Sequence, residues 1–148
     1  MKTTIEKEWR SETGYTCRVV SCDMGHRCGY VGTTNHSIYY EKEYDHPSEK
    51  LNNESPESFF EVHGGITFSG KIDNSPLWWY GFDCAHWGDG KDLSLITNEK
   101  LREIYATTNE GTIKDTNYCI QECEKLAKQM QKFDPFYQRK EKLEKLLA

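Results

Sequence analysis

The chain has 148 residues, a mass of 17.3 kDa and a formal charge of −5, from 19 basic and 24 acidic side chains. This length corresponds to one domain whose core is large enough to fold without disulfide bonds. The acidic excess argues against nonspecific binding of a nucleic-acid polymer, because such binding depends on clustered lysines and arginines. A small anionic ligand remains compatible with the composition, since a few local arginines suffice for it.

No segment of the sequence predicts a membrane span or an export signal. The longest apolar run, Leu77–Phe82, is far shorter than the roughly 20 residues of a spanning helix. Residues 1–8 include an early lysine but lack the apolar stretch of a secretory signal. The six cysteines are too few for a disulfide scaffold. We therefore expect a cytoplasmic protein with reduced thiols and no membrane contact.

The N-terminal part of the chain predicts β-structure. Residues 3–32 alternate β-favouring and polar side chains around a turn at 11–14, which is typical of a hairpin followed by a third strand. Segment 36–57 is rich in Asn, Glu, Ser, Pro and Lys, so we expect a long, mobile surface loop there. Phe59–Ser69 and Leu77–Cys84 are rich in aromatic and β-branched residues and predict two neighbouring strands.

Helical spacing begins after residue 90. A cap at residues 97–98 predicts a short helix that ends near Tyr105, and a cap at 115–116 predicts a longer one. The pair Asp134-Pro135 ends this longer helix, and a final charged helix follows. The longer helix has an apolar stripe that must pack on another layer, formed by Cys119, Cys123, Leu126, Ala127 and Met130.

Strands followed by helices predict an α+β fold. We expect an antiparallel β-sheet in the N-terminal two thirds, with two to three C-terminal helices packed on it. One domain is expected over residues 1–148, mainly β through residue 90 and mainly helical from residue 91. The last helix carries Leu143 and Leu147 in a background of Lys and Glu, and we also expect a homo-oligomer.

The segment 78–90 combines tryptophans, acidic side chains, a histidine and glycines. Asp83, His86 and Asp89 follow one another at intervals of three in a loop whose glycines allow tight bends. In one interpretation the aspartates cap turns, and the histidine forms a hydrogen bond with a neighbouring group. Alternatively, the carboxylates and imidazole bind a divalent metal together with His63, or a tryptophan stacks on a ligand in a metal-free polar pocket. The sequence leaves all three interpretations open.

Two further glycine-rich segments carry candidate ligand groups. Gly64-Gly65 interrupts an otherwise good strand, which indicates a bulge or a close approach and singles out the neighbouring His63. A hydrogen bond from its ring to a carbonyl is the ordinary alternative. Segment 24–32 places Arg27 among three glycines. Such a segment either receives a phosphate or carboxylate through its N–H groups and guanidinium, or forms a tight turn with a solvated arginine.

Four segments, in this order, resemble a family of short phage and prophage proteins: Gly25–Val31, Val62–Ser69 (VHGGITFS), Trp78–Asp89 (WWYGFDCAHWGD) and Tyr118–Cys123. The resemblance implies an accessory protein of a mobile element. Small phage proteins with an N-terminal β portion and C-terminal helices include anti-defence sponges, such as those of the Thoeris anti-defence type. Those proteins bind cyclic nucleotide or cyclic ADP-ribose signals and keep them from host immune effectors. The likeness to them is one of architecture, and no ligand residue is transferred from it.

From these observations we expect a non-catalytic protein that binds and sequesters a small anionic signal nucleotide and so evades host immunity. The expected ligand-binding residues are Arg27, His63, Trp79, Asp83, His86, Trp87 and Asp89, in which an indole stacks on the base and the arginine neutralises phosphate. One alternative is a metal-dependent hydrolase of a phosphoester signal that uses the histidines and aspartates of this set. Another is an inhibitor that binds a host protein through an exposed aromatic patch. The sequence identifies neither a cofactor nor a metal.

Overall fold

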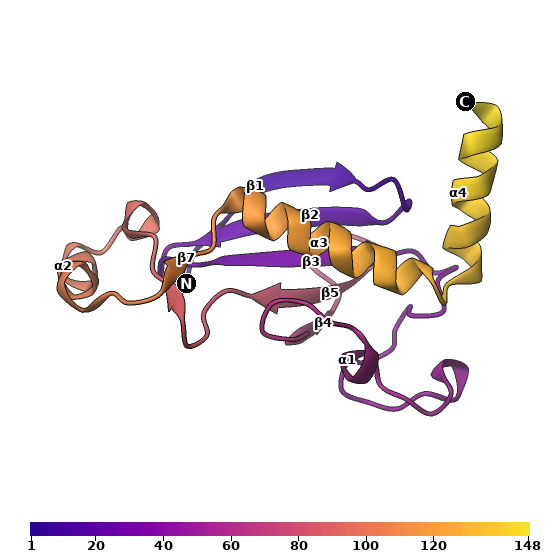
Figure 1. Cartoon of the computed structure of the whole chain (residues 1–148), viewed down its shortest axis with the longest axis horizontal. Helices are drawn as coiled ribbons and strands as arrows, with labels where there is room; N and C mark the ends of the chain where they lie inside the picture. The colour runs from indigo at the N-terminus through magenta and orange to yellow at the C-terminus, as the bar shows by residue number, and fades with distance from the viewer.

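Five antiparallel strands form the main sheet of the computed structural model, which describes residues 1–148 (Figure 1). The spatial order of the strands is β1-β2-β3-β5-β4. Their bounds are Thr3–Arg10 for β1, Thr16–Cys22 for β2, Arg27–Thr33 for β3, Phe68–Gly70 for β4 and Trp78–Asp83 for β5. A separate parallel pair joins β6 (Asp89–Gly90) to β7 (Thr112–Ile113). The predicted antiparallel sheet is therefore confirmed, and its first three strands follow the hairpin pattern of the sequence.

The helices follow in the C-terminal part of the chain. Their bounds are Glu99–Thr108 for α2, Thr116–Gln131 for α3 and Pro135–Leu147 for α4, while α1 (Pro56–Phe59) is a single turn. Short 3₁₀ helices cover Glu49–Leu51 and Leu93–Leu95. Helix α3 lies across the sheet against β2 and β3, and α2 and α4 lie at opposite ends of the molecule (Figure 1). None of the helices combines the length and apolar character that crossing a membrane requires.

Local signals in the sequence place these helices correctly. Asn98 Oδ1 accepts a hydrogen bond from the Leu101 amide, and Asp115 Oδ1 accepts one from the Tyr118 amide, so both predicted N-caps are confirmed. Helix α4 begins at Pro135, directly after the predicted break. Leu143 and Leu147, which the sequence places among charged residues of this helix, are exposed. The expected homo-oligomer stays a prediction.

The hydrophobic core lies between α3 and the sheet. The predicted stripe is buried as a whole: Cys119, Cys123, Leu126, Ala127 and Met130. It faces Cys17, Val19, Val31, Tyr80 and Phe82 of the strands. Gly29 allows this close packing, because a Cβ at that position would collide with the ring of Phe82. All six cysteines are free thiols, and all but Cys28 are buried.

The strand predicted over Phe59–Ser69 is largely wrong. Only its last two residues belong to a strand, β4, which pairs with β5 over three residues. Phe59 itself ends α1. Gly64 and Gly65 have φ angles of 69° and 80°, which no extended strand adopts, so the backbone turns at this point.

Before the bend the segment is held by α3, whereas after it the Thr67 amide donates to the Gly81 carbonyl of β5 over 2.9 Å. The Glu61 amide donates to Gln129 Oε1, and the His63 amide donates to Glu122 Oε1, each over 2.8 Å. These bonds satisfy backbone groups that a β-ladder would otherwise satisfy. The apolar residues of the segment pack in the core, namely Phe60, Val62 and Ile66.

Segment 36–57 has little regular structure, as expected, but it is anchored in the core. Tyr39 is fully buried and its hydroxyl donates to the Met130 carbonyl over 2.9 Å. The Tyr80 hydroxyl in turn donates to the Tyr39 carbonyl over 2.7 Å. Leu51 is also buried. These contacts connect the segment to both α3 and β5.

Candidate metal centre

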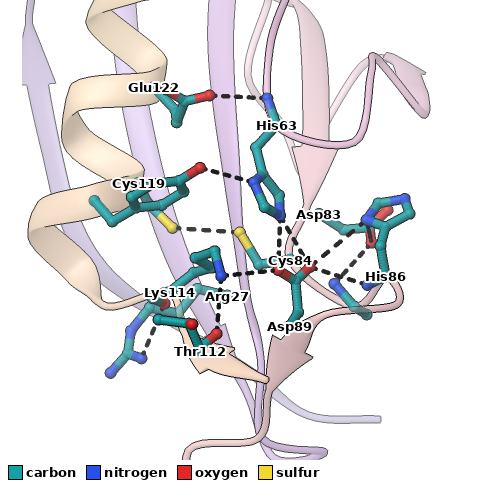
Figure 2. Close-up of polar contacts among 12 residues, drawn as sticks. Arg27, His63, Asp83, Cys84, His86, Asp89, Thr112, Lys114, Cys119 and Glu122 are labelled. Atoms are coloured by element: carbon teal, nitrogen blue, oxygen red, sulfur yellow. Dashed lines mark hydrogen bonds and ion pairs between the residues drawn. The ribbon is translucent and has the colours of Figure 1, made fainter. Parts of the chain in front are cut away.

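Four of the predicted site residues gather where β5 ends, beside the first turns of α3: His63, Asp83, His86 and Asp89 (Figure 2). His63 Nε2 lies 2.9 Å from each carboxylate oxygen of Asp89. His86 Nδ1 lies 3.4 Å from Asp83 Oδ1 and 3.8 Å from Asp89 Oδ2. One potential ligand atom each from His63, His86 and Asp89 lies within 4.8 Å of the other two.

A tight turn brings His86 and Asp89 together. The Asp89 amide donates to the His86 carbonyl over 2.9 Å, which closes a β-turn over residues 86–89. The His86 amide donates back to Asp89 Oδ2 over 3.0 Å. Gly88 occupies the third position of the turn with a φ of 92°, which favours glycine. The spacing of three thus places both side chains on one small loop.

The connection from α2 to α3 braces this turn from outside. The Thr112 amide donates to the Gly88 carbonyl over 2.9 Å, and β7 pairs with β6 directly after the turn. Gly111 has a φ of 94°, and a Cβ there would collide with the Gly88 carbonyl. The contact between the two segments therefore requires a glycine at 111.

His63 is oriented by two residues that lie one helical turn apart on α3. Its Nδ1 is 2.8 Å from the Tyr118 hydroxyl, and its amide donates to Glu122 Oε1. Gly64 leaves room for the neighbouring imidazole, because a Cβ at 64 would collide with the His86 ring. The two imidazole rings have their centroids 6.2 Å apart.

Asp89 is an ionised carboxylate with a nearly buried side chain, 4% exposed. Burial opposes its ionisation, but hydrogen bonds from His63, the His86 amide and Lys114 hold the pKa of Asp89 below its ordinary value. Lys114 Nζ lies 3.3 Å from Asp89 Oδ1 and donates to the Thr112 carbonyl over 2.9 Å. The carboxylate is therefore held in one orientation from three sides.

His86 Nδ1 has no hydrogen-bond partner although the atom is buried. The nearby Asp83 oxygen lies at ion-pair distance but not in hydrogen-bond geometry. Ligand atoms about 2.0–2.2 Å from a tetrahedral metal lie roughly 3.3–3.6 Å from one another. The separations of 2.9 and 3.8 Å around Asp89 bracket that range. The unpaired nitrogen is therefore a potential metal ligand beside His63 and Asp89.

The thiols behind His63 do not provide a nucleophile. Cys84 Sγ lies 3.7 Å from Cys119 Sγ, between β5 and α3 (Figure 2). The hydrogen bond with Cys119 and burial raise the pKa of Cys84 far above its ordinary value. A thiol that stays protonated is a poor nucleophile.

Of the other three predicted ligand residues, Arg27 and Trp79 lie apart from this cluster, and Trp87 lies on its turn with the side chain in solvent. Arg27 is nearly buried, with its Nε 2.7 Å from Glu6 Oε1 and its Nη1 3.0 Å from Asp92 Oδ2. Trp79 is 1% exposed and packs on the face of the sheet away from α3, under the guanidinium of Arg18. Trp87 is fully exposed at the second position of the 86–89 turn.

Three residues that contact His63 or Asp89 were not predicted from the sequence: Lys114, Tyr118 and Glu122. Tyr118 and Glu122 stand at i and i+4, directly before Cys119 and Cys123 of the buried stripe. A polar pair at that position borders the face that packs on the sheet, which is a usable signal. Nothing in the local sequence marks Lys114.

Comparison of the chain with protein-family models, with curated proteins and with solved structures finds no match. The resemblance to phage proteins thus stays a prediction. What the fold and the geometry define is an α+β protein in which two histidines and a buried aspartate converge at the end of a sheet.

Proposed function

We propose that the protein binds a divalent transition metal ion, zinc or manganese, through His63, His86 and Asp89 and uses it to hydrolyse a phosphoester. The buried, unpaired Nδ1 of His86 is the observation that carries this proposal. It lies beside a second imidazole and an ionised carboxylate, which are ordinary ligands of such metals. Three protein ligands leave coordination positions open for water and substrate, as in catalytic sites.

The surrounding residues suit such a site. A metal-bound His63 Nε2 leaves Nδ1–H to donate to the Tyr118 hydroxyl, and partners of this kind fix the tautomer and orientation of a ligand imidazole. Asp83 is partly exposed beside His86, and its Oδ2 accepts a hydrogen bond from Thr67 Oγ1 over 2.9 Å. Oδ1 of Asp83 accepts a hydrogen bond from the Ala85 amide over 3.1 Å and lies 3.4 Å from His86 Nδ1, so this oxygen borders the site.

The chemistry follows from these positions. A metal ion held by these residues would supply a bound water of lowered pKa as the nucleophile. Asp83 would accept the proton of the attacking water as its oxygen forms a bond to phosphorus and the ester P–O bond breaks. The leaving oxygen takes up a proton, which Asp83 can return. Asp83 thus has the role of the general base, and Asp89 that of a ligand.

The charges around the site favour a metal-dependent hydrolase over a protein that sequesters a nucleotide without a metal. Two carboxylates, Asp83 and Asp89, face a single cation, Lys114, so an anion is repelled from the site until a metal ion is bound. The arginine that the sequence assigned to phosphate is paired with Glu6 and Asp92. A metal ion would provide the missing positive charge.

Metal uptake by the purified protein tests the proposal. Chelator-treated protein is titrated with Zn²⁺ and Mn²⁺ by calorimetry, and the metal retained after gel filtration is measured. We expect one ion per chain in the wild type, loss of that ion in His86→Ala, and retention in His46→Ala, whose histidine is exposed on the 36–57 segment. Folded wild-type protein that binds neither ion would refute the site.

Hydrolysis needs its own measurement. The metal-loaded protein is assayed with p-nitrophenyl phosphate and its bis-ester, with Asp83→Asn as the variant that retains the metal ligands. Turnover by the wild type and its loss in Asp83→Asn are the expected results. Tight metal binding without turnover of either ester would support the metal site and contradict the proposed hydrolytic activity.

A further inference from the structure

Trp87 differs from the other three tryptophans of the chain. The indole N–H groups of Trp9 and Trp78 donate hydrogen bonds within the chain, and Trp79 is buried. Trp87 is 102% exposed and makes no hydrogen bond, ring stacking or cation–π contact. A large aromatic side chain of this kind gains much by contacting a ligand, because its whole surface is still in water.

The backbone that carries Trp87 is held at the metal centre. Residues 86–89 form the closed turn described above, so Trp87 directly follows one proposed ligand and precedes the other by two positions. The bond from Thr112 to the Gly88 carbonyl fixes the turn against β7. The indole therefore extends from an ordered turn whose ends are both proposed metal ligands.

His86 is the most accessible of the three proposed ligands. Two glycines near it also border open space, because a Cβ placed on Gly65 or on Gly88 would meet no atom within 4 Å. His86 itself is 37% exposed at its side chain, whereas Asp89 and His63 lie deeper, at 4% and 17%. The His86 side is therefore the side of the cluster most accessible to a ligand.

We infer that the substrate is a nucleoside phosphate whose base stacks on Trp87 while its phosphate binds the metal. This inference rests on the proposed metal site, since the carboxylates repel an anion without the ion. A flat base matches the face of an indole, and such stacking accepts every base, so the geometry selects the class of ligand and not one base. Trp87 would then contribute to substrate binding and not to metal binding.

Calorimetry of the zinc-loaded Asp83→Asn variant, which keeps the metal ligands but lacks the proposed base, tests the inference with three probes: adenosine monophosphate, ribose phosphate and adenosine. We expect adenosine monophosphate to bind about tenfold more tightly than ribose phosphate, which is the scale of one base–aromatic stack. Adenosine should bind weakly, because it lacks the group that reaches the metal. Removal of zinc should weaken the binding of adenosine monophosphate by at least the same tenfold factor.

Variants of Trp87 separate stacking from metal binding. Trp87→Ala should reduce the affinity for adenosine monophosphate to that for ribose phosphate and leave the zinc affinity unchanged. Trp87→Phe should keep most of the wild-type affinity for adenosine monophosphate. Leu146→Ala, which removes a comparably exposed apolar side chain on α4, should change neither affinity.

The outcomes distinguish this inference from the proposed function. Equal affinity for adenosine monophosphate and ribose phosphate, or an unchanged affinity in Trp87→Ala, would overturn the stacking role while zinc binding stands. A protein that takes up no metal would overturn both proposals together. Stronger binding of ribose phosphate than of the nucleotide would instead identify a sugar phosphate as the ligand class.

Discussion

His63 uses both of its ring nitrogens within the protein. Nε2 contacts both oxygens of Asp89, and Nδ1 contacts the Tyr118 hydroxyl over 2.8 Å. An imidazole held on both sides has little rotational freedom, so its ligand atom is presented in one direction before any ion arrives. Tyr118 is thus a positioning residue, because it acts on the metal only through His63.

Replacement of Tyr118 by phenylalanine tests that role. Tyr118→Phe removes one hydroxyl from a half-buried side chain and should lower the affinity for zinc by about 10–100-fold, the usual effect of losing a partner of a ligand histidine. The affinity is measured by competition with a chromophoric chelator, and the absorption spectrum of the cobalt-substituted protein reports the ligand geometry.

The matched control for Tyr118 is Tyr105→Phe on α2, whose ring contacts Lys91 and lies outside the cluster. It should leave both zinc affinity and the cobalt spectrum unchanged. The same zinc affinity in Tyr118→Phe as in the wild type would show that the hydroxyl does not position His63.

At the level of elements, the parallel pair β6–β7 connects the metal turn to the helices. The pair joins only two residues on each side, and it lies between the end of β5 and the start of α3. Gly111 makes this pairing possible, since its backbone lies directly against the carbonyl of Gly88. The orientation of the metal ligands therefore depends on a segment more than 20 residues further along the chain.

Gly111→Ala should separate the two segments and weaken the metal site. The added Cβ collides with the Gly88 carbonyl, and a φ of 94° is unfavourable for alanine, so we expect a loss of stability of about 1–3 kcal/mol together with weaker zinc binding. Chemical denaturation and zinc titration measure the two effects.

Gly65→Ala is the matched control for Gly111→Ala, because Gly65 has a similar φ of 80° but open space around it. It carries the same backbone strain without the collision. If the two variants lose equal stability and equal zinc affinity, the contact between Gly111 and Gly88 contributes nothing specific.

The sequence predicts the elements whose causes are local. Asn98 and Asp115 cap helices through amides three residues ahead, and the stripe on α3 follows from spacing alone. The spacing of His86 and Asp89 likewise indicated that both could reach one site. Segment 60–67 was predicted wrongly because the amides of Glu61 and His63 bond to α3 side chains 68 and 59 residues away, and because the backbone turns at Gly64 and Gly65.

The site residues likewise differ in whether local sequence or distant contacts determine their surroundings. Arg27 looked available for a phosphate, but its carboxylate partners Glu6 and Asp92 lie on distant segments that fold against it. Trp79 lies on the face of the sheet opposite Tyr80, in agreement with the alternation of side chains along a strand. The sequence could not show that Arg18 covers that indole, or that His63 lies on the other side of the sheet.

At the scale of the whole molecule, Asp134 joins three segments at the far end of α3 from the metal centre. It is fully buried at the junction of α3 and α4. Its Oδ2 accepts hydrogen bonds from the Tyr15 hydroxyl over 2.8 Å and from Ser37 Oγ over 2.5 Å, while Oδ1 has no partner. The turn after β1 and the start of the 36–57 segment are thereby connected to the helices.

Burial raises the pKa of Asp134, although hydrogen bonds from Ser37 and Tyr15 oppose the shift. Because the folded state favours the protonated carboxyl, the stability that Asp134 contributes is complete below its ordinary pKa of 3.8 and is lost as the pH rises through the raised value. Asp92 has a lowered pKa and acts with the opposite sign, since its contribution is lost only as the pH falls below about 4. The two effects therefore occupy different pH windows.

Asp134→Asn, which keeps the side chain neutral, should remove the loss of stability that the ionisation of Asp134 causes as the pH rises. In the wild type, the free energy of unfolding should decrease as the pH rises above about 4, by roughly 1.4 kcal/mol for each unit by which the pKa is raised. The variant should show a flatter profile across that window, measured by urea denaturation at a series of pH values. Glu57→Gln, at an exposed carboxylate, should keep the wild-type slope. Parallel profiles for the wild type and Asp134→Asn would mean that the buried carboxyl does not ionise in this range, and that its connection of the three segments is insensitive to pH.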